Sequence, residues 1–143
     1  MSERKSDIER KKRYLKKYKK NQACIDDLKS RIEELDDRIK TVKSPTLSGM
    51  PRGGLPKTKE DLIADKDDLE RRLKVREEKA PKLKRIITDE IDNLDDTRYI
   101  NILELFLIEC LTFEDIADRL GYHSRHVERL YSEALNELVD NDI

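Results

Sequence analysis

The stretch LTFEDIADRLGYHSRHVERLYSEALNEL, Leu111 to Leu138, decides the fold of the C-terminal half of this chain. Thr112 is a residue type that caps helices, and Asp115, three residues later, is placed to complete a capping box. Gly121 can adopt the left-handed conformation that ends a helix at little cost. The pattern therefore predicts a helix-turn-helix, with helices from Phe113 to Arg119 and from about Ser124 onward.

Apolar residues in this stretch recur at helical spacing, which predicts one buried face on each helix. Ala117 is small enough to let the two helices cross closely. The residues expected inside are Ile116, Ala117 and Leu120 of the first helix and Val127, Leu130, Ala134, Leu135 and Leu138 of the second. The opposite face of the second helix is then expected to enter a DNA major groove with Ser124, Arg125, Glu128, Arg129 and Ser132.

The side chains on that outer face suit base and phosphate contacts. Arg125 and Arg129 could each bind guanine O6 and N7 with two hydrogen bonds, and Glu128 could accept from a cytosine amine. Ser124 and Ser132 could contact phosphates or bases. The alternative for each is a solvated side chain, and His126, which faces partly inward, is assigned a structural role.

Charge is distributed unevenly along the 143 residues. Charged residues make up 44% of the chain and aromatic residues 5%, which leaves little for a large core and favours a long helical protein. Residues 1–85 contain 27 basic and 17 acidic residues, whereas residues 86–143 contain 4 and 15. We therefore expect the two halves to have different partners, or to contact each other.

The residues 4–20, RKSDIERKKRYLKKYKK, form a block with ten basic and two acidic residues. The block runs without proline or glycine into a coiled-coil repeat of Ile25, Leu28, Ile32, Leu35, Ile39 and Val42. One helix of more than about thirty residues is expected here. Phosphate contacts, or contacts with the acidic C-terminal domain, are expected of Arg10, Lys11, Lys12, Arg13, Lys16 and Lys17.

The segment Ser44 to Lys57 contains three of the four prolines and three of the four glycines, and it predicts a loop. A second helix, about Lys59 to Lys79, carries a thinner apolar stripe of Leu62, Leu69 and Leu73. The two stripes predict an antiparallel helical hairpin, and Pro81 then marks a hinge or a fresh helix start. The expected fold is all-α, with the hairpin in residues 1–80 and a small helical domain in residues 81–143.

The chain resembles two known groups of proteins. The segment LTFEDIADRLGYHSRHVERLYSEAL resembles region 4 of bacterial sigma factors, which reads the promoter −35 element. With the coiled coil, the loop and the segment from Ile91 to Leu135, the chain resembles the RinA and ArpU type of phage and prophage late-gene regulators. The usual glycine-containing turn of that family is replaced here by Glu109 and Cys110. The resemblance implies promoter binding, activation of phage late genes and a location in the cytoplasm of a bacterial host.

Other classes of protein are less compatible with the sequence. No nucleophile with a nearby base and no phosphate-binding glycine loop occurs, so we expect no enzyme and no cofactor. A metal site drawn from Cys24, Cys110, His123 and His126 lacks closely paired cysteines. The widely separated cysteines favour a reducing compartment, and the absence of a long apolar run argues against a membrane partner.

Two functional hypotheses remain open. In the first, the protein is a DNA-binding regulator that forms a homo-oligomer through its coiled coil and presents two recognition helices. In the second, it is an adaptor that docks on RNA polymerase or another protein and contacts DNA little.

Overall fold

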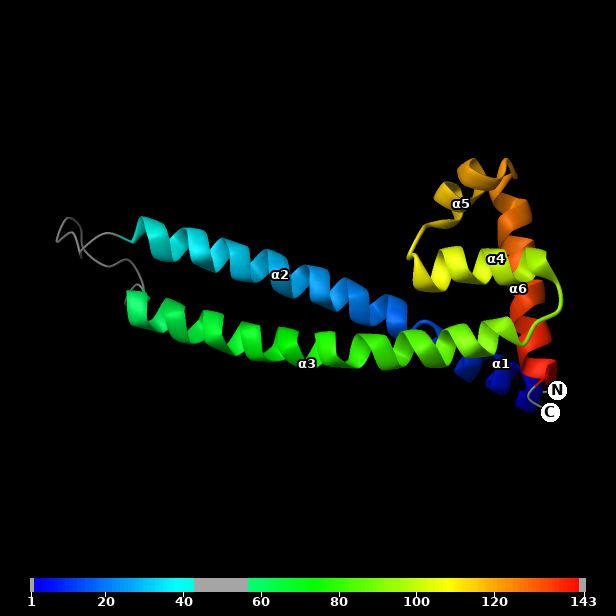
Figure 1. Ribbon diagram of the computed structural model, residues 1–143, viewed down its shortest axis with the longest axis horizontal. Helices are drawn as coiled ribbons and strands as arrows, with labels where there is room; N and C mark the ends of the chain where they lie inside the picture. The colour runs from blue at the N-terminus through cyan, green and yellow to red at the C-terminus, as the bar shows by residue number, and fades with distance from the viewer. Residues whose placement is uncertain (1, 43–56, 142–143) are drawn as a thin grey trace. The chain divides into compact units, whose positions relative to one another are not determined.

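The computed structural model describes residues 2–42 and 57–141, and within these ranges every regular element is a helix. The all-α class predicted from the sequence is confirmed. Figure 1 shows the elements in chain order: α1 (Ser2–Leu15), α2 (Lys17–Thr41), α3 (Lys59–Asp92), α4 (Thr97–Leu103), the π-helix η1 (Glu104–Ile108), α5 (Phe113–Leu120) and α6 (Ser124–Asn141). The loop predicted for Ser44 to Lys57 lies, apart from Lys57, outside the described residues.

Two compact units make up the chain. One, called the hairpin unit below, spans Ala23 to Lys79. The other, called the helical domain, combines the residues up to Gln22 with those from Ala80 onward. This division corrects the boundary expected from the sequence, which had assigned the N-terminal basic block to the same unit as the hairpin. The block belongs to the helical domain because Leu15 and Tyr18 are buried in that domain's core.

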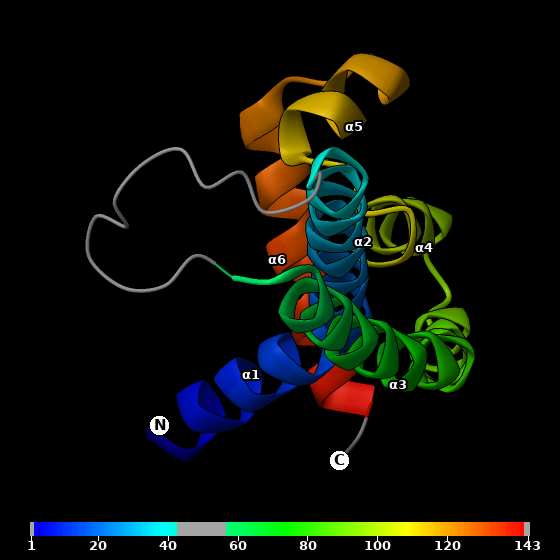
Figure 2. The ribbon, with the colours of Figure 1, turned by 90° about the vertical axis from the view of Figure 1, so that its left-hand side faces the viewer.

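The hairpin unit consists of α2 and the distal part of α3, which lie side by side and run in opposite directions (Figures 1 and 2). Ile25, Leu28 and Leu62 are buried. Most of the rest of the stripe, including Leu35 and Leu69, is only half-buried, and Val42 at its end is exposed. Asp36 of α2 and Lys66 of α3 form an ion pair at 2.6 Å, which lowers the pKa of Asp36 through the hydrogen bond that Lys66 donates. The predicted antiparallel hairpin is therefore present, with a seam that is covered only in part.

The helix expected to be continuous from the basic block into the coiled coil bends at Lys16, where the chain makes a turn between α1 and α2. Leu15, immediately before the turn, is fully buried, and Tyr18, two residues after Lys16, is 8% exposed. The two residues are three positions apart, so they lie on one face and enter the same core. The backbone N–H of Lys16 bonds to the carbonyl of Lys12 and the N–H of Lys20 bonds to the carbonyl of Lys16, so the expected long helix is present with a bend at Lys16.

Pro81 lies inside α3, so the fresh helix start, one of the two roles expected for it, is wrong. The boundary between the two units falls beside it, between Lys79 and Ala80. Proline removes one backbone donor and costs about 3 kcal/mol in a helix interior. After the proline the helix packs in the core of the helical domain, where Ile87 and Ile91 are buried and Leu83 packs against them. Tertiary packing thus outweighs the local penalty.

The helical domain is built around α6, against which α1, α4 and α5 pack. Its core contains Leu15 and Tyr18 of the N-terminal segment, Ile87 and Ile91 of α3, and side chains from each later helix. No helix in residues 2–42 and 57–141 has both the length and the apolar character that a membrane span requires.

Candidate nucleic-acid interface

The first helix of the predicted helix-turn-helix begins with the expected capping box. The backbone N–H of Asp115 donates to Thr112 Oγ1 at 3.1 Å, and the Thr112 N–H donates to Asp115 Oδ2 at 3.4 Å. Helix α5 ends at Gly121, whose φ of 72° is left-handed. A Cβ built on Gly121 would meet nothing within 4 Å, so the backbone angle alone calls for glycine. The local signals at both ends of α5 are confirmed.

The inner faces of α5 and α6 are buried as predicted. Ile116 is fully buried and Ala117 is 6% exposed, so the small side chain lies inside the crossing of the two helices. The inner face of α6 is 3% exposed or less at every predicted position, namely Val127, Leu130, Ala134, Leu135 and Leu138. Leu120, expected inside, is only half-buried at the end of α5. Burial of one face leaves the other face of α6 directed to solvent.

The outer face of α6 carries the residues predicted to read DNA. Four of them, Arg125, Glu128, Arg129 and Ser132, are exposed. Ser124 is half-buried, because it is the first residue of the helix and follows the turn directly. The structure therefore brings all five candidates onto the N-terminal half of one helix, with Ser124 the least accessible.

Arg129 contacts His126, a side chain outside the predicted site that in turn contacts Tyr122. Its Nη2 lies 2.6 Å from Nδ1 of His126, one turn earlier on α6. The ring of Tyr122 contacts His126 edge-on, with centroids 5.0 Å apart. Because a guanidinium only donates, Nδ1 of His126 is the acceptor, which places the ring proton on Nε2. His126 was expected to be structural, and the structure adds a contact between its ring and one of the candidate residues, Arg129.

An aromatic cluster supports α6 from behind. The rings of Phe106 and Phe113 stack with centroids 4.5 Å apart, and Tyr131 packs against both at 4.8 and 5.3 Å. Burial raises the pKa of Tyr131 to about 12. The cluster joins η1, α5 and α6, so it fixes the angle at which α6 is presented. Sequence reasoning missed it, although Phe113 and Phe106 frame the turn that leads into α5.

The turn between η1 and α5 contains a residue in the left-handed backbone conformation that glycine usually adopts, although the residue is a cysteine. Cys110 has a φ of 61°, and the N–H of Leu111 bonds across it to the carbonyl of Leu105 at 3.0 Å. This bond closes a wider ring than the corresponding bond of a Schellman helix end, as expected after a π-helix, whose own bonds are wider than those of an α-helix. Lys19 also binds the end of η1, donating to the carbonyls of Phe106 at 3.2 Å and Leu111 at 3.3 Å. Burial lowers the pKa of Lys19.

The N-terminal basic block contacts the acidic part of its own domain. Lys11 pairs with Glu90 at 2.9 Å and its side chain is only 12% exposed, so it is not available for phosphate. Arg4 pairs with Asp140, near the C-terminal end of α6, at 2.6 Å. Arg10 is exposed and pairs with Asp7, and Lys12 is half-buried. The remaining three of the six predicted phosphate contacts, Arg13, Lys16 and Lys17, are exposed.

Two of these basic residues are paired with acidic residues of the helical domain away from the N-terminal half of α6. The ion pair of Arg4 reaches α6 at Asp140, several turns beyond Arg125 and Arg129. The other role expected from the sequence, a contact between the basic block and the acidic domain, therefore has direct geometric support in Lys11 and Arg4.

Within residues 2–42 and 57–141, no three His, Cys, Asp or Glu side chains gather where they could hold a metal ion. The candidate site is therefore a surface, made by one face of α6 and held by a capped helix, a glycine turn and an aromatic cluster. This chain matches no protein-family model, no curated protein and no solved structure.

Proposed function

We propose that the protein is a sequence-specific DNA-binding transcriptional regulator that reads promoter DNA with α6, as the resemblance to phage late-gene activators implies. One observation carries the proposal. The N-terminal half of α6 presents Arg125, Glu128, Arg129 and Ser132 to solvent, while the opposite face of the same helix is buried. Recognition helices of helix-turn-helix proteins contact base edges with their N-terminal residues.

The distribution of positive charge supports the same assignment. Residues 86–143 contain only four arginines and lysines, and three of them, Arg119, Arg125 and Arg129, lie in the helix-turn-helix. All three are exposed. Within residues 86–143, which are otherwise strongly acidic, three of the four cations therefore lie on α5 and α6, and two of them, Arg125 and Arg129, lie on the face of α6 proposed to meet DNA.

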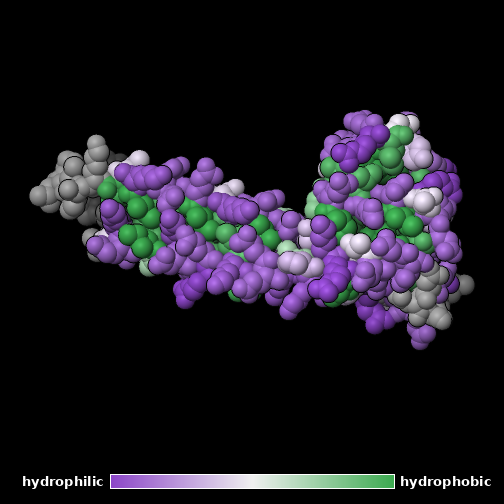
Figure 3. Space-filling model, viewed as in Figure 1, coloured by the Kyte–Doolittle hydropathy of each residue, from purple (hydrophilic) through white to green (hydrophobic). Residues whose placement is uncertain are grey.

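The proposal includes a homo-oligomer formed through the hairpin unit. Figure 3 shows hydrophobic patches among the hydrophilic side chains of the hairpin, and Ile32, Leu35, Ile39, Leu69 and Leu73 are half-buried. A second copy packed along this seam would cover these residues and would present two recognition helices to repeated half-sites.

The test begins with selection of bound duplexes from a random library by the purified protein. Fluorescence anisotropy then compares the selected sequence with a scrambled duplex of the same composition. We expect preference for the selected sequence, lost in Arg125→Ala and kept in the control Asn136→Ala, whose side chain is exposed further along α6. Enrichment of no sequence would contradict the proposal.

A second candidate function is an adaptor that docks on RNA polymerase through the acidic surface of the helical domain. It is favoured by the 15 acidic residues in residues 86–143, of which Glu137 and Asp140 are exposed on the distal half of α6. Polymerase capture by the immobilised chain without sequence preference on DNA would support this candidate. Capture lost in Glu137→Lys would place the contact on α6.

A further inference from the structure

Helix α3 changes charge abruptly along its length. Residues 59–70 contain two basic and six acidic residues, whereas residues 71–79 contain five basic and two acidic residues. The five cations, Arg71, Arg72, Lys74, Arg76 and Lys79, are all exposed. In sequence the basic run continues to Lys82, Lys84 and Arg85. A cluster of positive charge this dense, bounded on both sides by acidic segments, attracts anions locally.

The hairpin unit gives this block a shaped surface. A groove of about 320 Å³ between α2 and α3 is lined by Arg31, Arg72, Arg76 and Lys79, together with Cys24, Leu28 and Val75. Asp27, which pairs with Arg31 at 3.2 Å, is the one carboxylate among the described residues that line it. Glu77 and Glu78 do not line the groove. Four cations therefore face one carboxylate.

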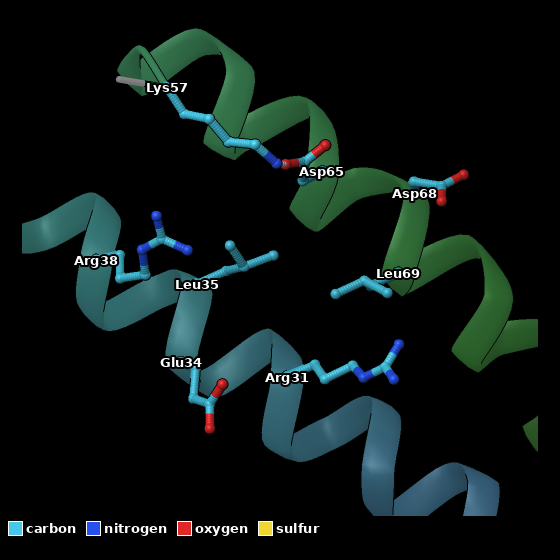
Figure 4. A pocket seen from close by; sticks show the side chains of 8 residues that line it. All are labelled: Arg31, Glu34, Leu35, Arg38, Lys57, Asp65, Asp68 and Leu69. Carbon is cyan, nitrogen blue, oxygen red and sulfur yellow. Dashed lines mark hydrogen bonds and ion pairs between the residues drawn. The ribbon is translucent and has the colours of Figure 1, made fainter. Parts of the chain in front are cut away.

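The neighbouring groove of the same hairpin provides an internal comparison. It has a similar volume of about 330 Å³, and Figure 4 shows Arg31, Arg38 and Lys57 around it with Glu34, Asp65 and Asp68. Its charges balance, and Lys57 pairs with Asp65 at 2.6 Å. Accumulated positive charge is thus specific to the groove lined by Arg72, Arg76 and Lys79, rather than a general property of the hairpin.

We infer that the groove of Arg31, Arg72, Arg76 and Lys79 is a second DNA contact, which binds the phosphate backbone without reading its sequence. Arginine, which supplies three of the four cations, bonds phosphate oxygens bidentately. The groove suits an acidic amphipathic peptide less well, because Val75 is its single exposed large apolar side chain and Leu28 is 4% exposed. The inference rests on the DNA binding proposed above. The residues that it involves are separate from those of α6.

The test measures the affinity of the full chain for the selected duplex and for a scrambled duplex over a range of salt concentration. The variant is Arg72→Gln/Arg76→Gln/Lys79→Gln. Its matched control, Lys29→Gln/Lys40→Gln/Lys59→Gln, removes the same charge from exposed positions of α2 and α3 outside the groove. Circular dichroism of both variants verifies that the helices are intact.

Three lost phosphate contacts should reduce the slope of log affinity against log salt by about 2.7, so the affinity loss between about 50 and 200 mM salt becomes about 40-fold smaller. We expect this for both duplexes with the groove variant and for neither with the control. Equal slopes for the groove variant and the control, with DNA still bound, would overturn the inference alone. Polyglutamate serves as a probe for an acidic polypeptide. If the groove variant loses affinity for polyglutamate but not for DNA, the inference is also overturned, and the groove binds acidic protein segments instead.

The result is distinguishable from failure of the proposed function. Binding that shows no sequence preference but a reduced slope in the groove variant would overturn reading by α6 and support the groove contact. If the unmodified chain binds neither duplex, both proposals are wrong.

Discussion

The guanidinium of Arg129 is held by His126, with Nη2 2.6 Å from Nδ1 across one turn of α6. His126 is in turn braced by the ring of Tyr122. The contact limits the rotamers of a long side chain on the proposed reading face. An ordered arginine loses less conformational entropy when it binds a base edge than a freely rotating one does.

We expect Arg129→Ala to reduce discrimination between the selected and the scrambled duplex by about 1 to 3 kcal/mol, the usual value for a bidentate base contact. His126→Ala keeps Arg129 but removes its hydrogen-bond partner, so the loss of discrimination should be smaller, about 0.5 to 1.5 kcal/mol. His126→Gln, which keeps an acceptor, should recover part of that loss. Anisotropy competition measures all three, and unchanged discrimination in Arg129→Ala would exclude a base contact by this residue.

The second prediction concerns the left-handed Cys110. A non-glycine residue in this conformation costs roughly 1 to 2 kcal/mol, while glycine adopts it freely but loses more backbone entropy on folding. We expect Cys110→Gly to raise the free energy of unfolding by about 0.5 to 1 kcal/mol. Cys110→Ala removes the thiol and keeps the strain, so it should not stabilise. Urea unfolding compares the two, and equal stabilisation by alanine and glycine would point to the thiol instead of the backbone.

The third prediction follows from the burial of Leu15, which has no exposed surface in the core of the helical domain. Leu15→Ala should lower the free energy of unfolding by about 2 to 5 kcal/mol, as for other buried leucines. Lys16→Ala, at the exposed turn that follows, is the matched control and should change it by less than about 0.5 kcal/mol. Similar stability of both variants would mean that α1 is not part of the core.

Because Leu15 and Tyr18 are buried in the core, an N-terminal deletion is a poor test of phosphate contacts by the basic block. From the sequence alone, removing residues 1–20 would be expected to weaken DNA binding equally for all sequences. The deletion also removes two buried side chains and the Lys19 contacts with Phe106 and Leu111. Lost binding would then report unfolding, so point substitutions at exposed Arg13 and Lys17 are the better probes of phosphate contact.

The features predicted correctly depend on neighbours in sequence. The Thr112–Asp115 capping box, the glycine turn at Gly121 and the buried face of α6 are each encoded within a few residues, where hydrogen bonding and periodicity act locally. They account for the helix-turn-helix and for the exposure of four of the five candidate residues on α6.

The features missed depend on tertiary contacts. Leu15 and Tyr18 are buried in the helical domain together with Ile87 and Ile91, and α3 reaches this core by continuing through Pro81. The pairing of Lys11 with Glu90 joins residues far apart in the chain, so no local pattern indicates that this lysine is removed from solvent. Local rules therefore identified the helices and the exposed outer face of α6, but not which cations remain exposed.

The last prediction concerns Tyr131, which is 6% exposed within the aromatic cluster. Its hydroxyl is buried and has no hydrogen-bond partner among the described residues. A buried hydroxyl without a partner costs about 1 to 3 kcal/mol, so Tyr131→Phe, which keeps the ring packing, should stabilise the helical domain by about 1 kcal/mol at neutral pH. The control is Tyr122→Phe, since the Tyr122 side chain is 37% exposed.

The same substitution should change the response to alkali. Burial raises the pKa of Tyr131 from 10.0 to about 12, so between these values the folded state keeps a proton that the unfolded state releases. Below about pH 10 the hydroxyl is protonated in both states and the stability does not depend on its titration, and the free energy of unfolding falls as the pH rises from about 10 to about 12. The free energy of unfolding of Tyr131→Phe should therefore fall less than that of the parent over this pH range. Part of the fall remains in the variant, because the pKa values of Tyr18 and Tyr99 are also raised. Urea titrations at a series of pH values measure the difference, and a Tyr131→Phe variant less stable than the parent at neutral pH would show that the hydroxyl is bonded after all.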